Sequence, residues 1–346
     1  MSTTDRSPAD PIVAATASTG TPSLSVVVCA YTMDRWDDLR ACIGSLRRQR
    51  RPADEILLVV DHCPELAVRA AAELPALLPA GPPAVRIVAN GERRGLSGAR
   101  NTGVRAATCE VVAFLDDDAA AEPDWTERLL AGYRDPRVLG VGGLVRPWWE
   151  TGRPSWFPPE FDWVVGCSYR GLPEQPCPVR NFIGANMSFR RARLLAAGGF
   201  RSDLGRVGTR PLGCEETELC LRLTADTPHG VLLYEPSAAV RHHVPTARTT
   251  WRYFRARCYG EGLSKAAVAR RAGAGPALAS ERRYLRSTLP RALARGVRGL
   301  RPGAVGHGGP QALGALLAGV AVTSAGYAVG LLRQDTRADP YRGSPP

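Results

Sequence analysis

The sequence predicts an α/β protein whose Rossmann-like sheet is mixed but mainly parallel, followed by a C-terminal helical extension. From residue 24 onward, short apolar and β-branched runs alternate with segments of helical periodicity, which is typical of βαβ units. Acidic or polar residues directly follow several of these runs, as expected where ligands bind at the carboxyl ends of parallel strands. At 346 residues, the chain can bury a substantial core in one large domain or two smaller ones.

The expected elements follow one another in a regular order. Strands are predicted at 24–30, 55–60, 85–88, 111–115 and 138–145, with helices near 37–48, 64–78, 97–107 and 123–133 between them. Pro123 marks the start of the last of these helices, because proline is favoured in a first helical turn. After a loop-rich stretch at 147–178, we expect strands at 182–189, 231–234 and 238–242 and helices at 191–197 and 215–224.

The loop-rich stretch contains four of the seven tryptophans, at positions 148, 149, 156 and 163. Aromatic faces often hold sugar or lipid ligands, so this stretch is a candidate ligand-binding cleft. Packing of the tryptophans against the rest of the protein is the alternative.

Composition and charge restrict the class of protein. A net charge of +12 suggests anionic partners, but seven arginines fall between residues 282 and 301, so much of the excess is local. Aromatic residues are not interleaved with basic ones and no zinc-finger spacing occurs, which argues against nucleic acid as a partner. Nine cysteines without a CxxC pair argue against a disulfide framework and favour a reducing cytoplasm.

The apolar segment 311–332 has 22 residues without a formal charge, enough to cross a bilayer as a helix. The arginines that precede it suit an anionic cytoplasmic leaflet. We expect membrane attachment by this helix, either spanning or lying in the interface, and a buried helix of a soluble protein is the alternative.

We therefore predict five segments along the chain. They are a disordered N-terminal tail without signal-peptide features (1–23), the α/β domain (24–249), a basic helical extension (250–310), the apolar helix (311–332) and a polar tail (333–346).

Three consecutive aspartates, Asp116, Asp117 and Asp118, end the apolar run 111–115. Three carboxylates at a strand end repel one another unless a cation neutralises them, and oxygen ligands favour Mg²⁺ or Mn²⁺. A helix cap or a solvated turn would also use aspartate.

Other polar positions lie at neighbouring strand ends. Ala30 and Tyr31 end the first strand, where main-chain groups and a side chain can hold a nucleobase, and Asp61 ends the second, where it can accept hydrogen bonds from a base or ribose. The segment 95–103 contains Gly95, Ser97, Arg100 and Asn101. Its small residues would let a nucleotide approach the backbone and its arginine would offset phosphate charge; close helix packing is the alternative.

Together these segments resemble the family 2 glycosyltransferases, which have a GT-A fold and use nucleotide-sugar donors. The resemblance rests on Val28–Tyr31, Asp61, Gly95–Gly103 and Phe114–Asp118, and order and spacing agree over roughly residues 24 to 245. It places the family's DxD motif on Asp116, toward the ribose, and on Asp118, toward a metal that bridges the diphosphate. Asp117 receives no role.

The resemblance also assigns residues further along the chain. Glu215 and Glu216 match the family's acidic pair, whose second member is the catalytic base of an inverting transfer, and Glu215 is the alternative base. Gly184, Ala185 and Asn186 match a segment near the donor sugar and acceptor. His242, preferred over His243, matches a late histidine at the metal or diphosphate.

The expected function is therefore metal-dependent, inverting transfer of a hexosyl or glucuronosyl group from a nucleotide sugar, with UDP as the default and GDP or dTDP as alternatives. The segment 255–265 resembles a subset of the family with membrane-associated C-terminal regions, which implies a glycan or polyprenyl-linked acceptor. The expected location is the cytoplasmic face of the plasma membrane, with the cytoplasm as the alternative. A sugar-phosphate nucleotidyltransferase or an inactive nucleotide-sugar-binding partner are the competing functions. The sequence does not indicate an oligomeric state.

Overall fold

The computed structural model describes residues 20–77, 83–202, 213–273, 278–298 and 309–332. Most of the predicted N-terminal tail, the polar tail at 333–346 and residues 299–308, which include Arg301, lie outside the described residues. The division of the chain into five segments stays a prediction.

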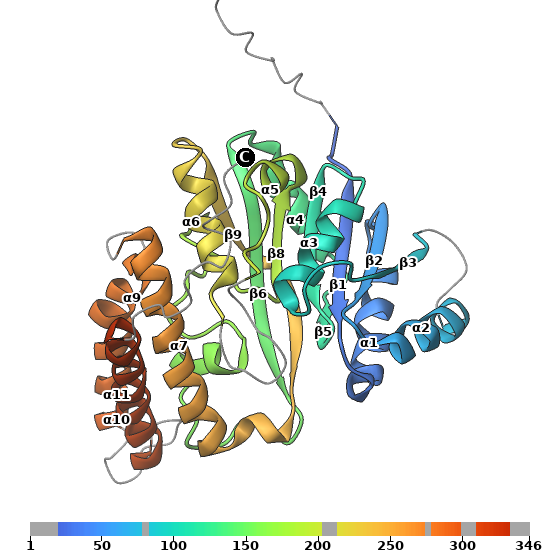
Figure 1. Ribbon diagram of the computed structural model, residues 1–346. Helices are drawn as coiled ribbons and strands as arrows, with labels where there is room; N and C mark the ends of the chain where they lie inside the picture. The colour runs from blue at the N-terminus through green and yellow to red at the C-terminus, as the bar shows by residue number, and fades with distance from the viewer. Residues whose placement is uncertain (1–19, 78–82, 203–212, 274–277, 299–308, 333–346) are drawn as a thin grey trace, which may run out of the picture.

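The centre of the molecule is a nine-stranded mixed sheet in the order β3-β2-β1-β4-β8-β6-β9-β5, with β7 paired to β9 (Figure 1). The first four strands are parallel: β1 (Leu24–Ala30), β2 (Glu55–Val60), β3 (Val85–Ala89) and β4 (Val111–Asp116). Next to them, β8 (Asn186–Arg190) runs antiparallel to both β4 and β6 (Val138–Trp149), and β9 (Val231–Val244) returns parallel to β6. The expected mixed, mainly parallel α/β fold is confirmed.

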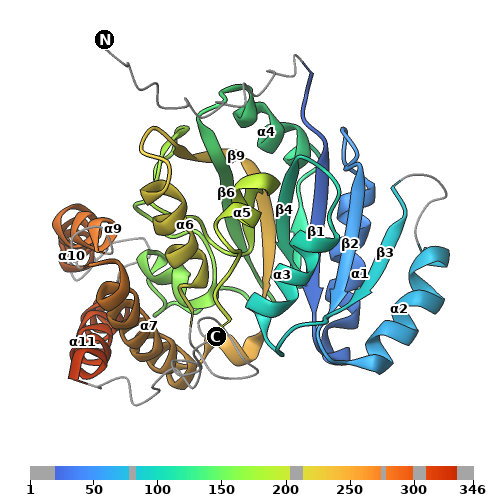
Figure 2. The ribbon, with the colours of Figure 1, turned by 45° about the horizontal axis from the view of Figure 1, so that its top comes forward.

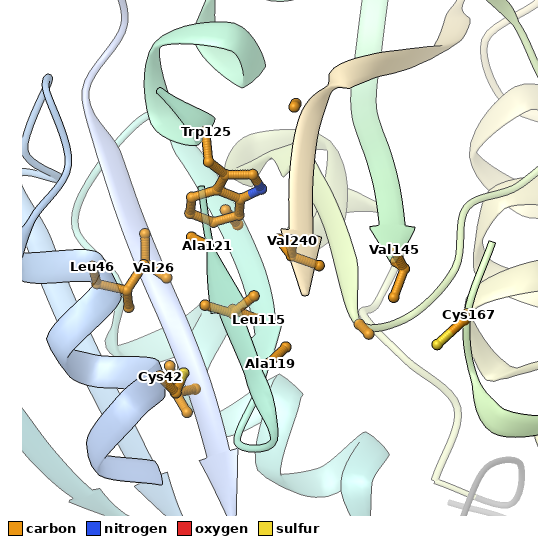
Figure 3. Packing of buried hydrophobic residues seen from close by; sticks show 14 of the residues in the cluster. Val26, Cys42, Leu46, Leu115, Ala119, Ala121, Trp125, Val145, Cys167 and Val240 are labelled. Atoms are coloured by element: carbon orange, nitrogen blue, oxygen red, sulfur yellow. The ribbon is translucent and has the colours of Figure 1, made fainter. Parts of the chain in front are cut away.

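Helices cover both faces of the sheet. One face packs against α1 (Trp36–Arg47), α2 (Pro64–Leu77) and α4 (Trp125–Ala131), and the other against α3 (Leu96–Ala106), α5 (Arg191–Ala196) and α6 (Glu215–Ala225). Figure 3 shows part of the first layer, where Val26 and Leu115 of the strands pack near Leu46 and Trp125 of the helices. Burial on both faces explains why these strands read as continuous apolar runs.

Four parts of the strand prediction need correction. The strand expected at 182–189 begins only at Asn186 and ends at Arg190, because residues 184 and 185 form a turn closed by the Asn186 N–H, which donates to the Ile183 carbonyl at 3.0 Å. β6 continues to Trp149, four residues beyond its predicted end, because β9 pairs with it along this extension. The two strands expected at 231–234 and 238–242 are one strand, since the extra residues around Pro236 form a bulge between the pairs Gly143–Glu235 and Val145–Val240. β5 (Ala119–Ala121) was not expected and forms by antiparallel pairing with β9.

Short helical turns fill the connections. They are η1 (Met33–Arg35), η2 (Gly132–Arg134), η3 (Pro159–Val165) and η4 (Thr246–Thr249), and β7 (Cys177–Pro178) lies in the loop-rich stretch. Two tryptophans of that stretch pack on other aromatic rings: Trp156 stacks on Trp251 at 4.5 Å between ring centroids, and Trp149 contacts Phe157 edge-on. Trp163 lines the main cavity of the protein. All nine cysteines are free thiols.

The C-terminal helices gather at the β6–β9 side of the sheet, away from β3 (Figures 1 and 2). They are α7 (Trp251–Ala272), α9 (Ala279–Arg283), a π-helical turn η5 (Tyr284–Thr288), α10 (Leu289–Arg298) and α11 (Pro310–Leu332). The long helices α7 and α11 pack closely because glycines face the partner helix: Gly262 contacts α11, while Gly326 and Gly330 contact α7. The helix expected at 311–332 therefore exists, and it packs on the extension that precedes it.

Candidate active site

A cavity of about 960 Å³ opens at the carboxyl edge of the parallel strands. The ends of β1, β2 and β4 and the start of α3 form one end of it, while α7, α9, η5 and α11 form the other. The first turn of α6 lies on its wall between them. Asp116, Asp118 and Glu216 all line this one space.

The aspartates occupy the turn from β4 into β5. Asp116 ends β4 and is partly exposed to the cavity, whereas Asp117 and Asp118 are buried. An Asp118 oxygen lies 3.1 Å from His242 Nε2, and its other oxygen lies 3.1 Å from an Arg35 nitrogen and 3.3 Å from an Arg248 nitrogen. Burial alone would raise the pKa of Asp118, but His242 and the two arginines lower it below its ordinary value.

Asp117 has a different environment from its neighbour. Arg35 donates a hydrogen bond to one of its oxygens at 2.9 Å, and the other oxygen is buried without a partner among the described residues. Burial and the Asp118 carboxylate raise the pKa of Asp117 to about 7. The middle aspartate therefore pairs with Arg35, while its two neighbours face His242 and Arg100.

The residues at this turn fit a divalent cation. One ligand atom each from Asp116, Asp118 and His242 lie within 4.8 Å of one another. Two carboxylates and one imidazole are suitable ligands for a first-row divalent ion such as Mn²⁺, and the carboxylates also suit Mg²⁺. Within the described part of the chain, this is the cluster of acidic and histidine side chains whose spacing suits a metal.

The two histidines on β9 have opposite surroundings. His242 lines the cavity beside Asp118, whereas His243 pairs with Asp38 at 2.9 Å and contacts the Trp148 ring. This follows from the alternation of side chains along a strand.

Arg100 connects the two acidic regions of the cavity. Its side chain, only 2% exposed, lies 2.9 Å from a Glu215 oxygen and 3.5 Å from an Asp116 oxygen, and it donates to the Gly184 carbonyl at 3.1 Å. We expected this arginine to offset phosphate charge; its observed partners are protein carboxylates. A side chain larger than glycine at position 184 would crowd the guanidinium, since a Cβ there would lie 2.9 Å from it.

Glu215 and Glu216 begin α6 and differ in their contacts. One Glu215 oxygen accepts from Arg100, while Glu216 is half-buried, lines the cavity and accepts a hydrogen bond from the Thr217 hydroxyl at 3.2 Å. Burial, followed by repulsion from Glu215, raises the pKa of Glu216 to about 8. Cys214 before them adopts a left-handed backbone with φ of 72°, a conformation that non-glycine residues adopt at a cost.

The end of the cavity formed by β1, β2 and β4 contains several of the residues expected to bind the nucleotide. Ala30, Tyr31 and Asp61 line the cavity, and Ala185 lies beside Gly184 on its wall. The Asp61 carboxylate accepts hydrogen bonds from the Gly95 backbone at 2.9 Å and the Asn90 amide at 2.6 Å. It therefore shapes the turn before α3 in addition to facing the cavity.

Three expected site residues lie outside the cavity lining. Asn101 forms two hydrogen bonds with the Phe200 backbone, and Ser97 is buried in α3. Asn186 is fully buried, and its amide contacts Trp125 and two backbone carbonyls. The polar groups of Asn101 and Asn186 bind the protein itself, and a ligand-binding role for these three residues stays a prediction.

The structure also brings in residues that sequence reasoning missed. Arg35 and Arg248 contact Asp118, and Cys167 lies 3.7 Å from His242. The signal available for the arginines was their position just after β1 and β9, where site residues gather, but arginine is too frequent in this chain to stand out. The cavity contribution of α11 was missed because the helix was expected to sit in a membrane.

The mixed sheet, with the cavity at the carboxyl edge of its parallel strands, is the fold of the GT-A glycosyltransferases. The structure is similar to a mannosyltransferase from Pyrobaculum calidifontis, solved with GDP-mannose and Mn²⁺, with a TM-score of 0.54 and 21% identity over 91% of this chain and 88% of that one. Residues 25–195 match the model of Glycosyl transferase family 2. The chain belongs to this family.

Two curated relatives support this assignment. A glucosyl-dolichyl phosphate glucuronosyltransferase from Haloferax volcanii is 36% identical over 243 residues, which are 70% of this chain and 76% of the relative. A probable polypeptide N-acetylgalactosaminyltransferase 8 from Homo sapiens is 30% identical over 58% of this chain and 33% of its own length.

Proposed function

We propose that this glycosyltransferase moves a sugar, with inversion, from a UDP-sugar to a hydroxyl of a lipid-linked glycosyl phosphate. The observation that carries the proposal is the single cavity in which the Asp116–Asp118–His242 cluster and Glu216 lie on either side of Arg100. The acceptor class is suggested by the Haloferax relative, which is named for a glucosyl-dolichyl phosphate and a glucuronosyl group.

In this proposal the nucleotide occupies the end of the cavity formed by Tyr31, Asp61 and Gly95. Asp116 faces the ribose, and Asp116, Asp118 and His242 would together hold a Mg²⁺ or Mn²⁺ ion. When bound, the ion stabilises the negative charge that develops on the leaving diphosphate. Arg35 and Arg248 keep Asp118 ionised and ready to bind a cation.

Glu216 is the proposed base. Its carboxylate removes the proton from the acceptor hydroxyl while the hydroxyl oxygen attacks the anomeric carbon, and the bond to the diphosphate breaks on the opposite side. The raised pKa suits this role, because a more basic carboxylate binds the proton more strongly. Glu215 is engaged by Arg100 at 2.9 Å, which favours Glu216 over it.

We propose peripheral attachment to the cytoplasmic face of a membrane through α10 and α11. α11 is long and apolar enough to span a bilayer, yet it lines the cavity and packs on α7. Its exposed residues are mostly apolar, with Gln311 and Ser324 as polar exceptions, and Leu317, Leu331 and Leu332 are more than 45% exposed. The arginines of α10 add attraction to anionic lipid.

The competing functions fit less well. A sugar-phosphate nucleotidyltransferase would leave Glu215 and Glu216 without a role, although both line the cavity. An inactive binding partner would have no need for an acidic cluster with metal-like spacing beside a carboxylate of raised pKa.

Asp118→Asn tests the proposal. We expect it to lower Mn²⁺- or Mg²⁺-dependent hydrolysis of UDP-sugar and transfer to a lipid acceptor at least a hundredfold, since a metal ligand and its charge are lost. Asp38→Asn is the matched control, because Asp38 pairs with His243 outside the cavity. Metal-dependent turnover that persists in Asp118→Asn would refute the metal assignment.

A further inference from the structure

The cavity is large for a small-molecule site. Its volume of about 960 Å³ lies at the upper end of the range of roughly 300–1,000 Å³ for small-molecule sites. In the proposed function, the nucleotide fills the part of the cavity that is formed by the strand ends and α3. The remainder, which we call the C-terminal arm, is lined by α7, α9, η5 and α11.

The C-terminal arm carries an excess of positive charge. Four basic side chains line it, Arg180, Arg257, Lys265 and Arg283, together with two acidic ones, Glu261 and Glu281. An anion is therefore the favoured ligand of this arm.

Four of these six side chains form a network of ion pairs that connects the surrounding elements. Lys265 Nζ lies 3.0 Å from Glu261 and 2.5 Å from Glu281, and Arg180 contacts both oxygens of Glu281 at 2.5 and 3.1 Å. These pairs tie α9 to α7 and to the loop before β8. They hold in place the helices that carry the other two arginines.

Arg257 and Arg283 face the arm from two sides. Arg257, 11% exposed, projects from α7 and its ion pair with Glu261 spans 4.0 Å, the long limit for such a pair. Arg283 ends α9 at the exposed rim, and its guanidinium forms no ion pair with any residue that the structure describes. Two arginines that line one space suit a phosphate, which offers several acceptor oxygens.

The interior of the arm is lined by polar groups, and its rim is apolar in part. Thr323 and Tyr327 of α11 line its interior, and Leu285, next to the rim arginine, lines it while remaining half-exposed. The apolar stripe of α11 continues outside with Leu317 and Leu331. A ligand with a charged head and an apolar chain matches this order, because each part meets surface of its own polarity.

The inner end of the arm reaches the proposed base. Ser264 of α7 accepts a hydrogen bond from the Gly213 backbone at 3.2 Å, and Glu261 lies 3.7 Å from the Cys214 sulfur. Gly213 and Cys214 lie two to three residues before Glu216 in the sequence. The inner end of a ligand in the arm would therefore lie beside the Glu216 carboxylate.

We propose that the C-terminal arm is the acceptor site, in which Arg257 and Arg283 bind the phosphate of a lipid-linked glycosyl phosphate. Its sugar points toward Glu216, and its chain leaves past Leu285 along α11 to the membrane. This inference rests on the proposed function and adds the residues that recognise the phosphate.

The test uses the full chain in detergent and three acceptors: farnesyl-phosphoglucose, farnesyl glucoside without the phosphate, and glucosyl phosphate without the chain. We expect Arg257→Ala and Arg283→Ala each to raise KM for farnesyl-phosphoglucose at least tenfold. KM for farnesyl glucoside and hydrolysis of UDP-sugar by water should change less than twofold.

Arg286→Ala is the matched control, because Arg286 is exposed on η5, three residues from Arg283, and lies outside the cavity lining. Arg257→Lys keeps the positive charge and serves where Arg257→Ala does not fold. We expect its KM for farnesyl-phosphoglucose to lie between those of the unmodified enzyme and the alanine variant. An unchanged KM for farnesyl-phosphoglucose in both alanine variants, or an equal rise for farnesyl glucoside, would overturn the phosphate site.

The remaining outcomes separate this inference from the proposed function. Equal use of glucosyl phosphate and farnesyl-phosphoglucose by the unmodified enzyme would overturn the assignment of the lipid chain. Hydrolysis of UDP-sugar without transfer to any of the three would refute the acceptor class in the proposed function, and this inference with it. Normal transfer with unaffected arginine variants would refute the inference alone.

Discussion

Arg100 is the residue on which both acidic groups of the cavity depend. It is buried on α3 and pairs with Glu215 and Asp116, which come from parts of the chain far apart in sequence. A buried carboxylate without its cationic partner is strongly unfavourable. The arginine therefore allows the candidate metal cluster and the proposed base to share one cavity.

Arg100→Ala should lower the free energy of unfolding by about 3–5 kcal/mol, because Glu215 then stays buried without a partner. Urea unfolding measures the change. Arg105→Ala on the same helix breaks an exposed pair with Glu92 and should cost no more than about 1 kcal/mol. If the two variants lose similar amounts of unfolding free energy, the buried pair stabilises the protein no more than the exposed one.

Glu216 should give the reaction an unusual dependence on pH. A base acts in its ionised form, and burial raises the pKa of Glu216 to about 8, so turnover should rise with pH toward that value instead of levelling near pH 5. Glu216→Gln should abolish transfer while nucleotide binding persists. A pH–rate profile that is flat between pH 5 and 8 would exclude Glu216 as the titrating base.

The raised pKa of Glu216 also makes stability depend on pH. Turnover should rise with pH, whereas this contribution to stability falls. Because the folded-state pKa is above the ordinary value of 4.5, the protonated form favours folding. This contribution is complete below pH 4.5 and is lost as the pH rises through about 8. Glu216→Gln, which resembles the protonated acid, should therefore melt higher than the unmodified protein above pH 8, as measured by thermal unfolding.

At the scale of elements, the contact between α7 and α11 depends on glycine. A Cβ at Gly326 would overlap the Tyr259 carbonyl, and one at Gly262 would overlap the Thr323 carbonyl. The two helices therefore approach each other backbone to backbone. Any larger side chain would move α11, and with it one wall of the cavity.

Gly326→Leu should destabilise the protein by about 1–3 kcal/mol through overpacking and reduce transfer to a lipid acceptor more than hydrolysis of UDP-sugar. Gly314→Ala on the same helix meets no atom within 4 Å and should be neutral or stabilising by up to about 1 kcal/mol. Chemical unfolding together with the two activity assays distinguishes these cases. An equal response of both activities would show that α11 does not act on the acceptor side.

The elements that the sequence predicts well are those whose signal is local. β1, β2 and β4 are buried on both faces, so each reads as one uninterrupted apolar run. β5 is three alanines with no strand signal of their own, and it exists because β9 lies beside it. Pairing between distant segments is not encoded in local periodicity.

The same distinction applies to the candidate site. Asp118 and His242 stand out because a carboxylate and a histidine at the ends of apolar runs are suitable metal ligands, and the structure brings them within 3.1 Å. Asn186 lies in a segment that resembles the family's sugar-binding segment, yet its amide is hydrogen-bonded to Trp125 and to backbone carbonyls. Whether a polar side chain faces a ligand or the core depends on its neighbours in space.

For the whole molecule, the exposed stripe of α11 is the expected contact with lipid. Leu317→Glu combined with Leu331→Glu should release the protein from anionic vesicles, since charge at a buried position in the interface is costly. Leu195→Glu, at an exposed leucine of α5, should leave sedimentation with vesicles unchanged. Undiminished binding of the double variant would rule out attachment through this stripe.

The position of α11 in the chain also sets the order in which the cavity is built. The aspartates after β4 leave the ribosome early, whereas α11 begins at Pro310, roughly ten to forty seconds later at synthesis rates of about 5–20 residues per second. Until then the cavity lacks the wall formed by Val320, Thr323 and Tyr327. A nascent chain can therefore complete its nucleotide end during translation, but its full cavity forms only after this helix has emerged and docked on α7.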